Sequence, residues 1–205
     1  MKKTLSKVIS LVLMIIMISS SMSVFAKEKE GYSVRYVKEI PKGMEVLKFN
    51  TQKEADEFFA TLSKEISNFQ LTDKDLVDDK NGIKKNGQNN SIGIAGVGDK
   101  VTTSKRFQKR IVASLNTYLN LYVKYTYVDA ADPYGRAFVS IDEVSSYISG
   151  GTAFQNYTEY DAYVNYMKTY LAKCTAVGQF EYAVDVKGKI SIYTIDTEIS
   201  AEFRP

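Results

Sequence analysis

The second half of the chain alternates apolar and polar positions over long stretches. The alternation runs from Ile111 to Tyr127, within 110–129, and returns from Tyr170 to Val186. Successive side chains of a strand point to opposite faces, so we expect two long strands, each with one buried and one solvated face. Arg136–Ile148 predicts a further strand. Lys187-Gly188 predicts a tight turn into a return strand over 190–203, where the change of apolar parity suggests a β-bulge.

The first part of the chain predicts two short strands and one helix. The strands cover 32–37 and 44–49, with Pro41-Lys42-Gly43 as the turn between them. Apolar residues at helical spacing then predict a helix over 52–68. Thr51 and Glu54 form a capping box at its start. A similar pattern beginning at Thr158 predicts one or two helical turns within 158–167.

Turn-forming residues separate these two parts. Asp, Asn and Gly dominate from Leu71 to about Lys100, which is typical of a linker or loop. We therefore expect a strand-strand-helix module over 27–70, a flexible linker over 71–105, and a mainly β domain over 106–205. Long antiparallel strands within about 100 residues favour an immunoglobulin-like or related β-sandwich. The pattern leaves open whether 27–100 is a separate module, a propeptide or part of the sandwich.

The start of the chain has the features of a signal peptide. Three lysines precede the apolar run 8–18, and Val24-Phe25-Ala26 fits a signal-peptidase site. The run is too short for a comfortable membrane span, so we expect removal of 1–26 and no stable span afterwards. The product is predicted to be secreted, either released or associated with the cell wall.

Charge gives no support for nucleic-acid binding. The formal net charge of +3 equals the contribution of the three lysines before residue 26, so the mature chain is neutral. Residues 27–110 nevertheless carry an excess of four basic side chains, and 111–205 an excess of four acidic ones. The oligomeric state stays open.

The composition excludes several catalytic chemistries. The chain has no His and a single Cys, which rules out Ser-His-Asp and Cys-His catalysis, the common histidine zinc sites and an internal disulfide. Cys174 lies on the apolar parity of its strand and is expected to be an inert buried thiol. We expect no cofactor, no metal and no enzyme activity. Paired carboxylates at Asp142-Glu143 and Glu159/Asp161 leave a glycan hydrolase as an alternative.

Two loop segments have weak resemblance to ligand sites. The glycine-rich run 92–98 lacks the order of a dinucleotide-binding fingerprint. Asp73, Asp75, Asp78 and Asp79 offer oxygen ligands for calcium, but they do not match the EF-hand order. A solvated loop is the favoured interpretation, and a calcium site at 73–79 stays open.

Two groups of residues are candidates for binding. Tyrosines and amides alternate on the solvated face of the first long strand: Asn116, Tyr118, Asn120 and Tyr122. Flat rings beside amides suit sugar recognition, although Tyr is also a favoured cross-strand partner in any sheet. The second group is the basic run Lys105, Arg106, Lys109 and Arg110, which predicts contact with an anionic surface or a charged strand that discourages edge pairing.

The region from Arg106 to Phe203 resembles uncharacterised small exported β-sandwich proteins of Gram-positive bacteria. The resemblance rests on the signal peptide, Ser149-Gly150-Gly151, Gly178-Gln179-Phe180-Glu181-Tyr182 and Ser200-Ala201-Glu202-Phe203. It implies a fold and a location, and it transfers no site.

These observations predict a non-enzymatic exported module that binds a cell-wall polymer or a surface protein. A carboxylate-dependent glycan hydrolase and a membrane-active toxin or antimicrobial are the alternatives.

Overall fold

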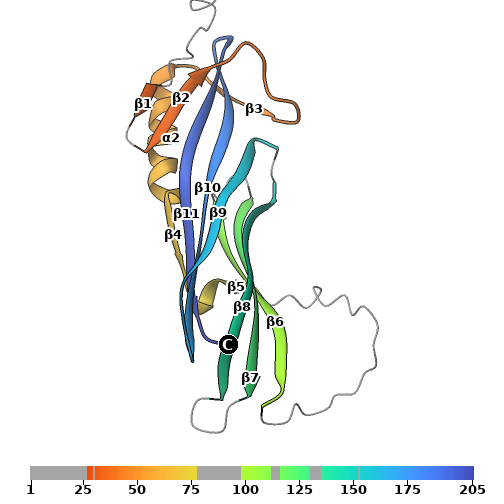
Figure 1. Cartoon of the computed structure of the whole chain (residues 1–205). Coiled ribbons are helices and arrows are strands. Elements are labelled where there is room, and N and C mark those ends of the chain that lie inside the picture. The colour runs from red at the N-terminus through yellow and green to blue at the C-terminus, as the bar shows by residue number, and fades with distance from the viewer. Residues whose placement is uncertain (1–26, 30, 78–97, 112–115, 130–134, 152) are drawn as a thin grey trace, which may run out of the picture.

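The computed structural model is mainly β, with antiparallel sheets and one helix, and this confirms the predicted fold class (Figure 1). Two sheets lie in a sandwich-like arrangement. Sheet A contains seven strands and sheet B contains four. The structure describes residues 27–29, 31–77, 98–111, 116–129, 135–151 and 153–205. The predicted signal peptide lies outside them.

A long hairpin forms the centre of sheet A. Strand β10 (Leu171–Val186) pairs with β11 (Lys189–Phe203) in unbroken register along its length. The turn residues Lys187 and Gly188 have φ values of 53° and 82°, which matches the tight turn predicted there. The predicted bulge in the return strand is wrong. The apolar parity changes because β11 buries side chains on both faces: Tyr193 and Ile195 face the main core, and Ile192 packs with Met44 on the other side.

The two strands predicted over 32–37 and 44–49 flank this hairpin instead of pairing with each other. β2 (Tyr32–Tyr36) and β4 (Asn68–Leu71) pair with the edge of β11 that faces away from β10, and β1 (Lys27–Lys29) pairs with β2. β3 (Val46–Phe49) and β9 (Gln155–Lys168) pair with the edge of β10 that faces away from β11. Strands β3 and β4 run parallel to their partners. The segment 27–70 therefore contributes strands to the same sheet as the C-terminal hairpin.

Helix α2 (Gln52–Ile66) forms where the capping box predicts it. The Thr51 hydroxyl accepts from the Glu54 N–H at 3.2 Å, and the Glu54 carboxylate accepts from the Asn50 N–H at 3.0 Å. The helix ends two residues earlier than predicted. Its buried face packs on sheet A, where the Phe59 ring lies 4.2 Å from the Tyr193 ring, centre to centre.

Sheet B is a meander of β5 (Leu76–Val77), β6 (Lys100–Ile111), β7 (Thr117–Asp129) and β8 (Arg136–Gly150). The single strand predicted over 110–129 is wrong, because Ile111 pairs with Thr117 across a hairpin. Apolar parity continues on both sides of this turn, which contains no Gly or Pro, so the pattern concealed it.

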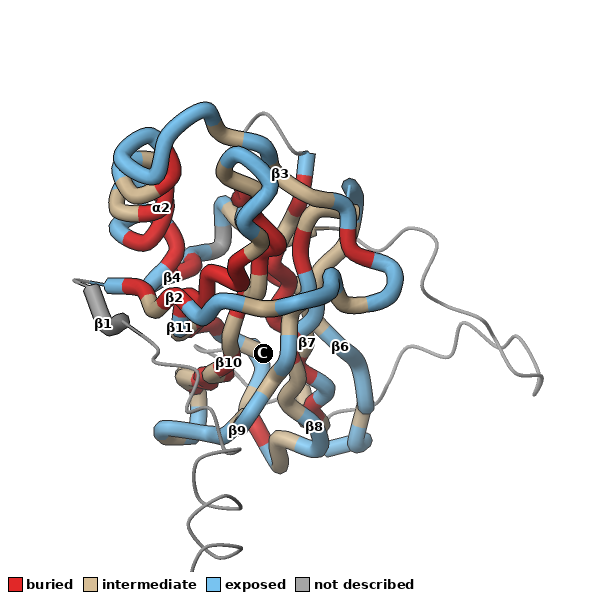
Figure 2. Tube along the Cα trace, turned by 90° about the horizontal axis from the view of Figure 1, so that it is seen from above, coloured by how far each residue is buried: buried red, intermediate tan, exposed pale blue. Residues whose placement is uncertain are grey.

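One hydrophobic core lies on the inner face of the β10–β11 hairpin. Helix α2 covers one half of this face and sheet B covers the other, where Phe107 and Tyr125 lie 5.5 and 5.7 Å from the Phe203 ring. Seen from above, the buried residues of both halves meet in the middle of the molecule (Figure 2). The front segment and the C-terminal half thus share a core as well as a sheet.

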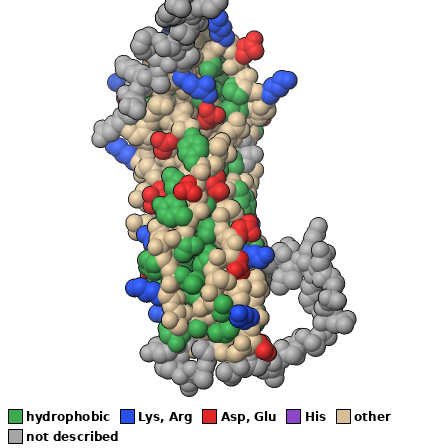
Figure 3. Space-filling view, viewed as in Figure 1, with side chains coloured by type: hydrophobic (Ala, Val, Ile, Leu, Met, Phe, Trp, Pro, Cys, Tyr) green, Lys and Arg blue, Asp and Glu red, His purple; other side chains and the backbone are tan. Residues whose placement is uncertain are grey.

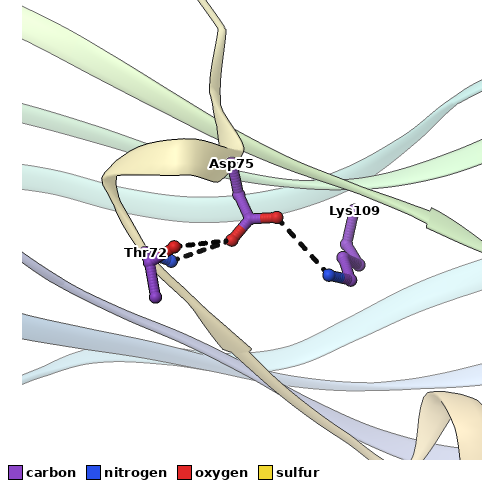
Figure 4. Close-up of polar contacts among 3 residues, drawn as sticks. All are labelled: Thr72, Asp75 and Lys109. Carbon is purple, nitrogen blue, oxygen red and sulfur yellow. Dashed lines mark hydrogen bonds and ion pairs between the residues drawn. The ribbon is translucent and has the colours of Figure 1, made fainter.

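The linker predicted over 71–105 is wrong at both of its ends. Leu71 belongs to β4, residues 73–77 form the short 3₁₀ helix η1 (Asp73–Asp75) and β5, and 100–105 belong to β6. Asp75 secures the first of these ends. Its carboxylate accepts from the Thr72 N–H and hydroxyl at 3.0 and 3.1 Å and pairs with Lys109 at 3.4 Å (Figure 4). The central part, 78–97, lies outside the described residues.

The helical turns predicted within 158–167 are also wrong. These residues belong to β9, which pairs with β10 with register shifts at two places. The Thr158 and Asp161 spacing resembles a helix cap, but tyrosine, valine and threonine dominate the segment and favour a strand. The shifts disturb the period-2 alternation, which is why the sequence pattern did not reveal the strand.

Candidate functional site

The strand register places most of the candidate binding residues on the outer face of sheet B. Tyr118 lies between Arg110 and Ser149, Asn120 between Gln108 and Tyr147, and Tyr122 between Arg106 and Ser145. We call these nine residues the sheet-B face. Tyr118 and Tyr122 are four positions apart on β7, so their Cα atoms are separated by roughly 13 Å.

The basic run is divided between the two faces of β6. Arg106 and Arg110 lie on the sheet-B face as cross-strand neighbours of Tyr122 and Tyr118. Lys105 and Lys109 are opposite Val123 and Leu119, which are buried in the core, so they lie on the inner side. Lys109 pairs with Asp75 there. The sequence therefore grouped four cations that the fold separates into two pairs with different surroundings.

Asn120 is buried, although the alternation predicted it on the solvated face. Its side-chain amide donates to the Tyr147 carbonyl at 3.1 Å and to the Ser149 hydroxyl at 3.0 Å. Its side-chain oxygen accepts from Gln108 at 3.1 Å. This network joins β6, β7 and β8 beneath the tyrosines. Asn120 therefore holds the face together, and the tyrosine and arginine side chains are the groups that a ligand can reach.

The position of Tyr118 is fixed by the end of β8. A Cβ atom added to Gly150 would lie 3.3 Å from the Tyr118 ring and 2.3 Å from the Asn116 carbonyl oxygen. Glycine is required here for two reasons. The close approach leaves no room for a side chain, and the φ of 89° is one that residues with a side chain rarely adopt. The Tyr118 hydroxyl donates to the Asn116 side chain at 3.3 Å. The ring is thus held at one end of the face.

Two of the four candidate carboxylates, Asp142 and Glu159, have structural partners. Asp142 accepts from the Ser140 and Thr126 hydroxyls at 2.7 and 2.9 Å, and these hydrogen bonds lower its pKa. Glu159 accepts from the Ser146 hydroxyl at 2.6 Å and from the Ser146 N–H. Asp142-Glu143 belongs to sheet B, whereas Glu159 and Asp161 belong to β9 of sheet A. Neither of the two cavities described below is lined by any of the four.

The remaining chemical candidates are also inert or outside the described residues. Cys174 is buried, and burial raises the pKa of its thiol to about 12. Asp75 is occupied by Thr72 and Lys109, while Asp78, Asp79 and residues 92–97 lie outside the described part of the chain. Among the described residues, no group of three or more His, Cys, Asp or Glu side chains could hold a metal ion.

The outer face of sheet A has the opposite charge. Tyr160, Tyr163 and Tyr166 come from β9, and the facing strands contribute Glu181, Asp196, Glu198 and Glu202. The Tyr166 hydroxyl donates to Glu202. At mid-height on this side of the molecule, acidic side chains lie beside hydrophobic ones (Figure 3). A cavity of about 870 Å³ opens along the edge of β11, between the residues that pair with β2 and those that pair with β4, and is lined by Ser33, Ser67, Gln179, Asp196 and Glu198 among others.

A second cavity, of about 210 Å³, lies toward the end of sheet B where β6 and β8 begin, which we call the far end. It gathers Lys105 and Arg106 from β6, Tyr125 and Tyr127 from β7, and Arg136 from β8. Sequence reasoning missed Gln108, Tyr147 and Arg136 because their positions depend on cross-strand register. The one available signal was the alternation of Tyr147 and Ser149 within β8, which could have placed them on the solvated side.

Comparisons with protein families, with curated proteins and with solved structures find no match to the chain. The resemblance to exported Gram-positive β-sandwich proteins therefore stays a prediction. No helix in the part of the chain that the structure describes is long and apolar enough to cross a membrane.

Proposed function

We propose that this protein is a non-enzymatic binding module, and that its sheet-B face binds an anionic, hydroxyl-bearing polymer at the cell surface. One observation carries the proposal. Two arginines and two tyrosines, which the sequence places in separate segments, are cross-strand neighbours on a single face: Arg106 beside Tyr122 and Arg110 beside Tyr118.

The chemistry of the face suits such a ligand. Tyrosine rings offer flat apolar contact and a hydroxyl at the rim. The guanidinium group presents a planar set of donors that matches carboxylate and phosphate oxygens. Spacing of the rings along β7 favours an extended ligand over a compact one.

The face is also preorganised for binding. Asn120, Gln108 and Ser149 satisfy one another beneath the rings, and Tyr118 is packed against Gly150. A surface that is already ordered loses little conformational entropy when a ligand binds. This supports a binding role more than the presence of tyrosines alone.

The location in the proposal rests on the sequence. The segment 1–26 has the features of a signal peptide, and secretion with association to the cell wall stays a prediction. The hydrolase alternative gains no support, since Asp142 and Glu159 have separate structural partners. For the membrane-active alternative, the described residues offer no specific observation.

The test is retention of the purified protein on insoluble cell wall at about 0.1 M and about 1 M NaCl, between which the Debye length falls from ~10 to ~3 Å. We expect strong retention at low salt, and partial retention at high salt through the rings. Tyr118→Ala with Tyr122→Ala should reduce retention at both salts. Arg106→Gln with Arg110→Gln should reduce it mainly at low salt.

The matched control is Tyr160→Ala with Tyr163→Ala, which removes two tyrosines from the outer face of sheet A. It should bind as the unmodified protein does. Circular dichroism of each variant verifies that the fold survives. Unchanged retention of the Tyr118/Tyr122 variant, or equal loss in the control, would contradict the proposal.

A further inference from the structure

The cavity at the far end of sheet B combines positive charge with aromatic walls. Strands β6, β7 and β8 extend past the end of the β10–β11 hairpin (Figure 1). Beyond Val77, where β5 ends, the edge of β6 is no longer covered by that strand. The cavity of about 210 Å³ lies in this region, lined by Lys105, Arg106, Tyr125, Tyr127 and Arg136 together with Thr103 and Ser104.

The charge of the lining is one-sided. Lys105 and Arg136 bring positive charge to the inner side, the Arg106 side chain lies on the sheet-B face, and none of the lining residues that the structure describes is acidic. Outside the lining, Asp129 pairs with Arg136 at 3.4 Å. Cations gathered around a small cavity repel one another, and an anion placed among them removes that repulsion.

Two of the cations are held in place by aromatic rings. The Arg136 guanidinium carbon lies 4.6 Å from the centre of the Tyr127 ring. The Lys105 ammonium lies 5.8 Å from the Tyr125 ring and 5.6 Å from the Phe203 ring, and it donates to the Arg204 carbonyl. Stacking fixes the plane of a guanidinium group and leaves its N–H edge available to an oxyanion.

Neutral donors complete the lining. Thr103 is exposed on β6, lies on the same side of the strand as Lys105, and carries a hydroxyl group. Burial raises the pKa of Tyr125 to about 12, so its hydroxyl keeps its proton at neutral pH. Hydroxyls beside guanidinium and ammonium groups are the donor set that phosphate oxygens accept from.

We propose that this cavity binds an oxyanion of the phosphate class, with Arg136 and Lys105 as its charged ligands and the hydroxyl of Thr103 beside them. A water molecule occupies about 30 Å³ in the liquid, so the cavity has room for a phosphate group and a short attached chain. The source is either the free ion or a phosphodiester of a polymer. The site does not depend on the sheet-B face being a polymer-binding surface.

The experiment measures thermal unfolding and calorimetric binding of the purified protein with inorganic phosphate, with a glycerol phosphodiester and with acetate, each against chloride at equal ionic strength. We expect saturable binding of phosphate and no specific effect of acetate. Tighter binding of the diester than of inorganic phosphate identifies a polymer group as the source, and the reverse identifies the free ion. Equal effects of acetate and phosphate overturn the phosphate assignment.

The variants are Arg136→Gln and Lys105→Gln, with Lys124→Gln as the matched control. Lys124 lies on the same sheet but on its outer face, opposite Ser104 and Glu143, and does not line the cavity. Loss of a charge-assisted hydrogen bond should weaken phosphate binding about tenfold or more in either lining variant. Lys105→Gln keeps the Arg136–Tyr127 contact, so it remains informative if Arg136→Gln fails to fold. No phosphate binding by the unmodified protein, or an equal loss in Lys124→Gln, overturns the proposal.

Discussion

The outer faces of the two sheets each carry three tyrosines, but the side chains around them differ in charge and in construction. On sheet B the tyrosines lie beside Arg106 and Arg110, above a buried amide network. On sheet A they lie beside carboxylates such as Glu202. Tyrosine content alone therefore does not define a binding surface. Charge selects the partner, and the polar network beneath decides how firmly the rings are held.

The largest expected effect concerns that network. Asn120→Ala removes a buried amide that bonds to Gln108, Ser149 and the Tyr147 carbonyl, so it should lower the free energy of unfolding by about 2–3 kcal/mol. The counterpart on sheet A is Thr175→Val, which removes one hydrogen bond, to the exposed Asn165, and should cost about 1 kcal/mol. Urea unfolding followed by circular dichroism measures both. If Thr175→Val is the more damaging change, the two faces do not differ in construction as described.

An intermediate effect concerns the Asp75–Lys109 contact, which lies where the chain passes from β4 of sheet A to β5 of sheet B. Burial alone would raise the pKa of Asp75, but the hydrogen bonds from Thr72 and the charge of Lys109 outweigh it, and the pKa is lowered from 3.8. A lowered carboxyl pKa contributes stability above the unfolded value, and this contribution is lost as the pH falls below 3.8. Asp75→Asn should therefore cost about 1 kcal/mol or less at pH 7.

Unfolding of the Asp75→Asn variant at several pH values tests this account. The difference in free energy of unfolding between this variant and the unmodified protein should shrink as the pH falls below 3.8. If this difference in free energy of unfolding is the same at pH 7 and below pH 3.8, then packing, and not the ionised carboxylate, stabilises this junction.

The smallest effect belongs to an ion pair on the outer face of sheet A. Arg35 and Glu181 approach to 2.9 Å between β2 and β10, but both remain partly exposed. An exposed pair of this kind contributes little, so Glu181→Gln should change the free energy of unfolding by about 0.5 kcal/mol or less. The same urea experiment measures it. A loss as large as that of Asn120→Ala would mean that the sheet-A face is also held by a cooperative polar network.

Local patterns in the sequence predicted individual elements well. The capping box at Thr51 and Glu54 predicted the start of α2, and Lys187-Gly188 predicted the turn of the long hairpin. These features depend on residues close together in the chain. The change of parity in β11 was misread as a bulge because period-2 reasoning assumes that only one face of a strand is buried.

Features that depend on register were not predictable. The sequence placed Tyr118 and Tyr122 on a solvated face, but it could not show that Arg106 and Arg110 are their neighbours, since the turn before Thr117 was missed. Nor could it bring Arg136 to the same cavity as Lys105. Cross-strand neighbours are set by turn position, and one missed turn changes every pair in the sheet.

The order of the strands in sheet A has a consequence for how the chain folds. Val34 pairs with Tyr193 and Asn68 pairs with Glu198, so the first strands of the chain need partners that are synthesised last. In sheet B, the β6–β7 and β7–β8 hairpins join neighbouring segments through short loops, so these three strands can form early. The apolar faces of the front strands and of helix α2 therefore stay uncovered during synthesis until β11 is complete. A chain that stops before Lys189 would therefore lose the partner of β2 and β4 at the opposite end of the sequence, and we expect it to be retained by chaperones or degraded.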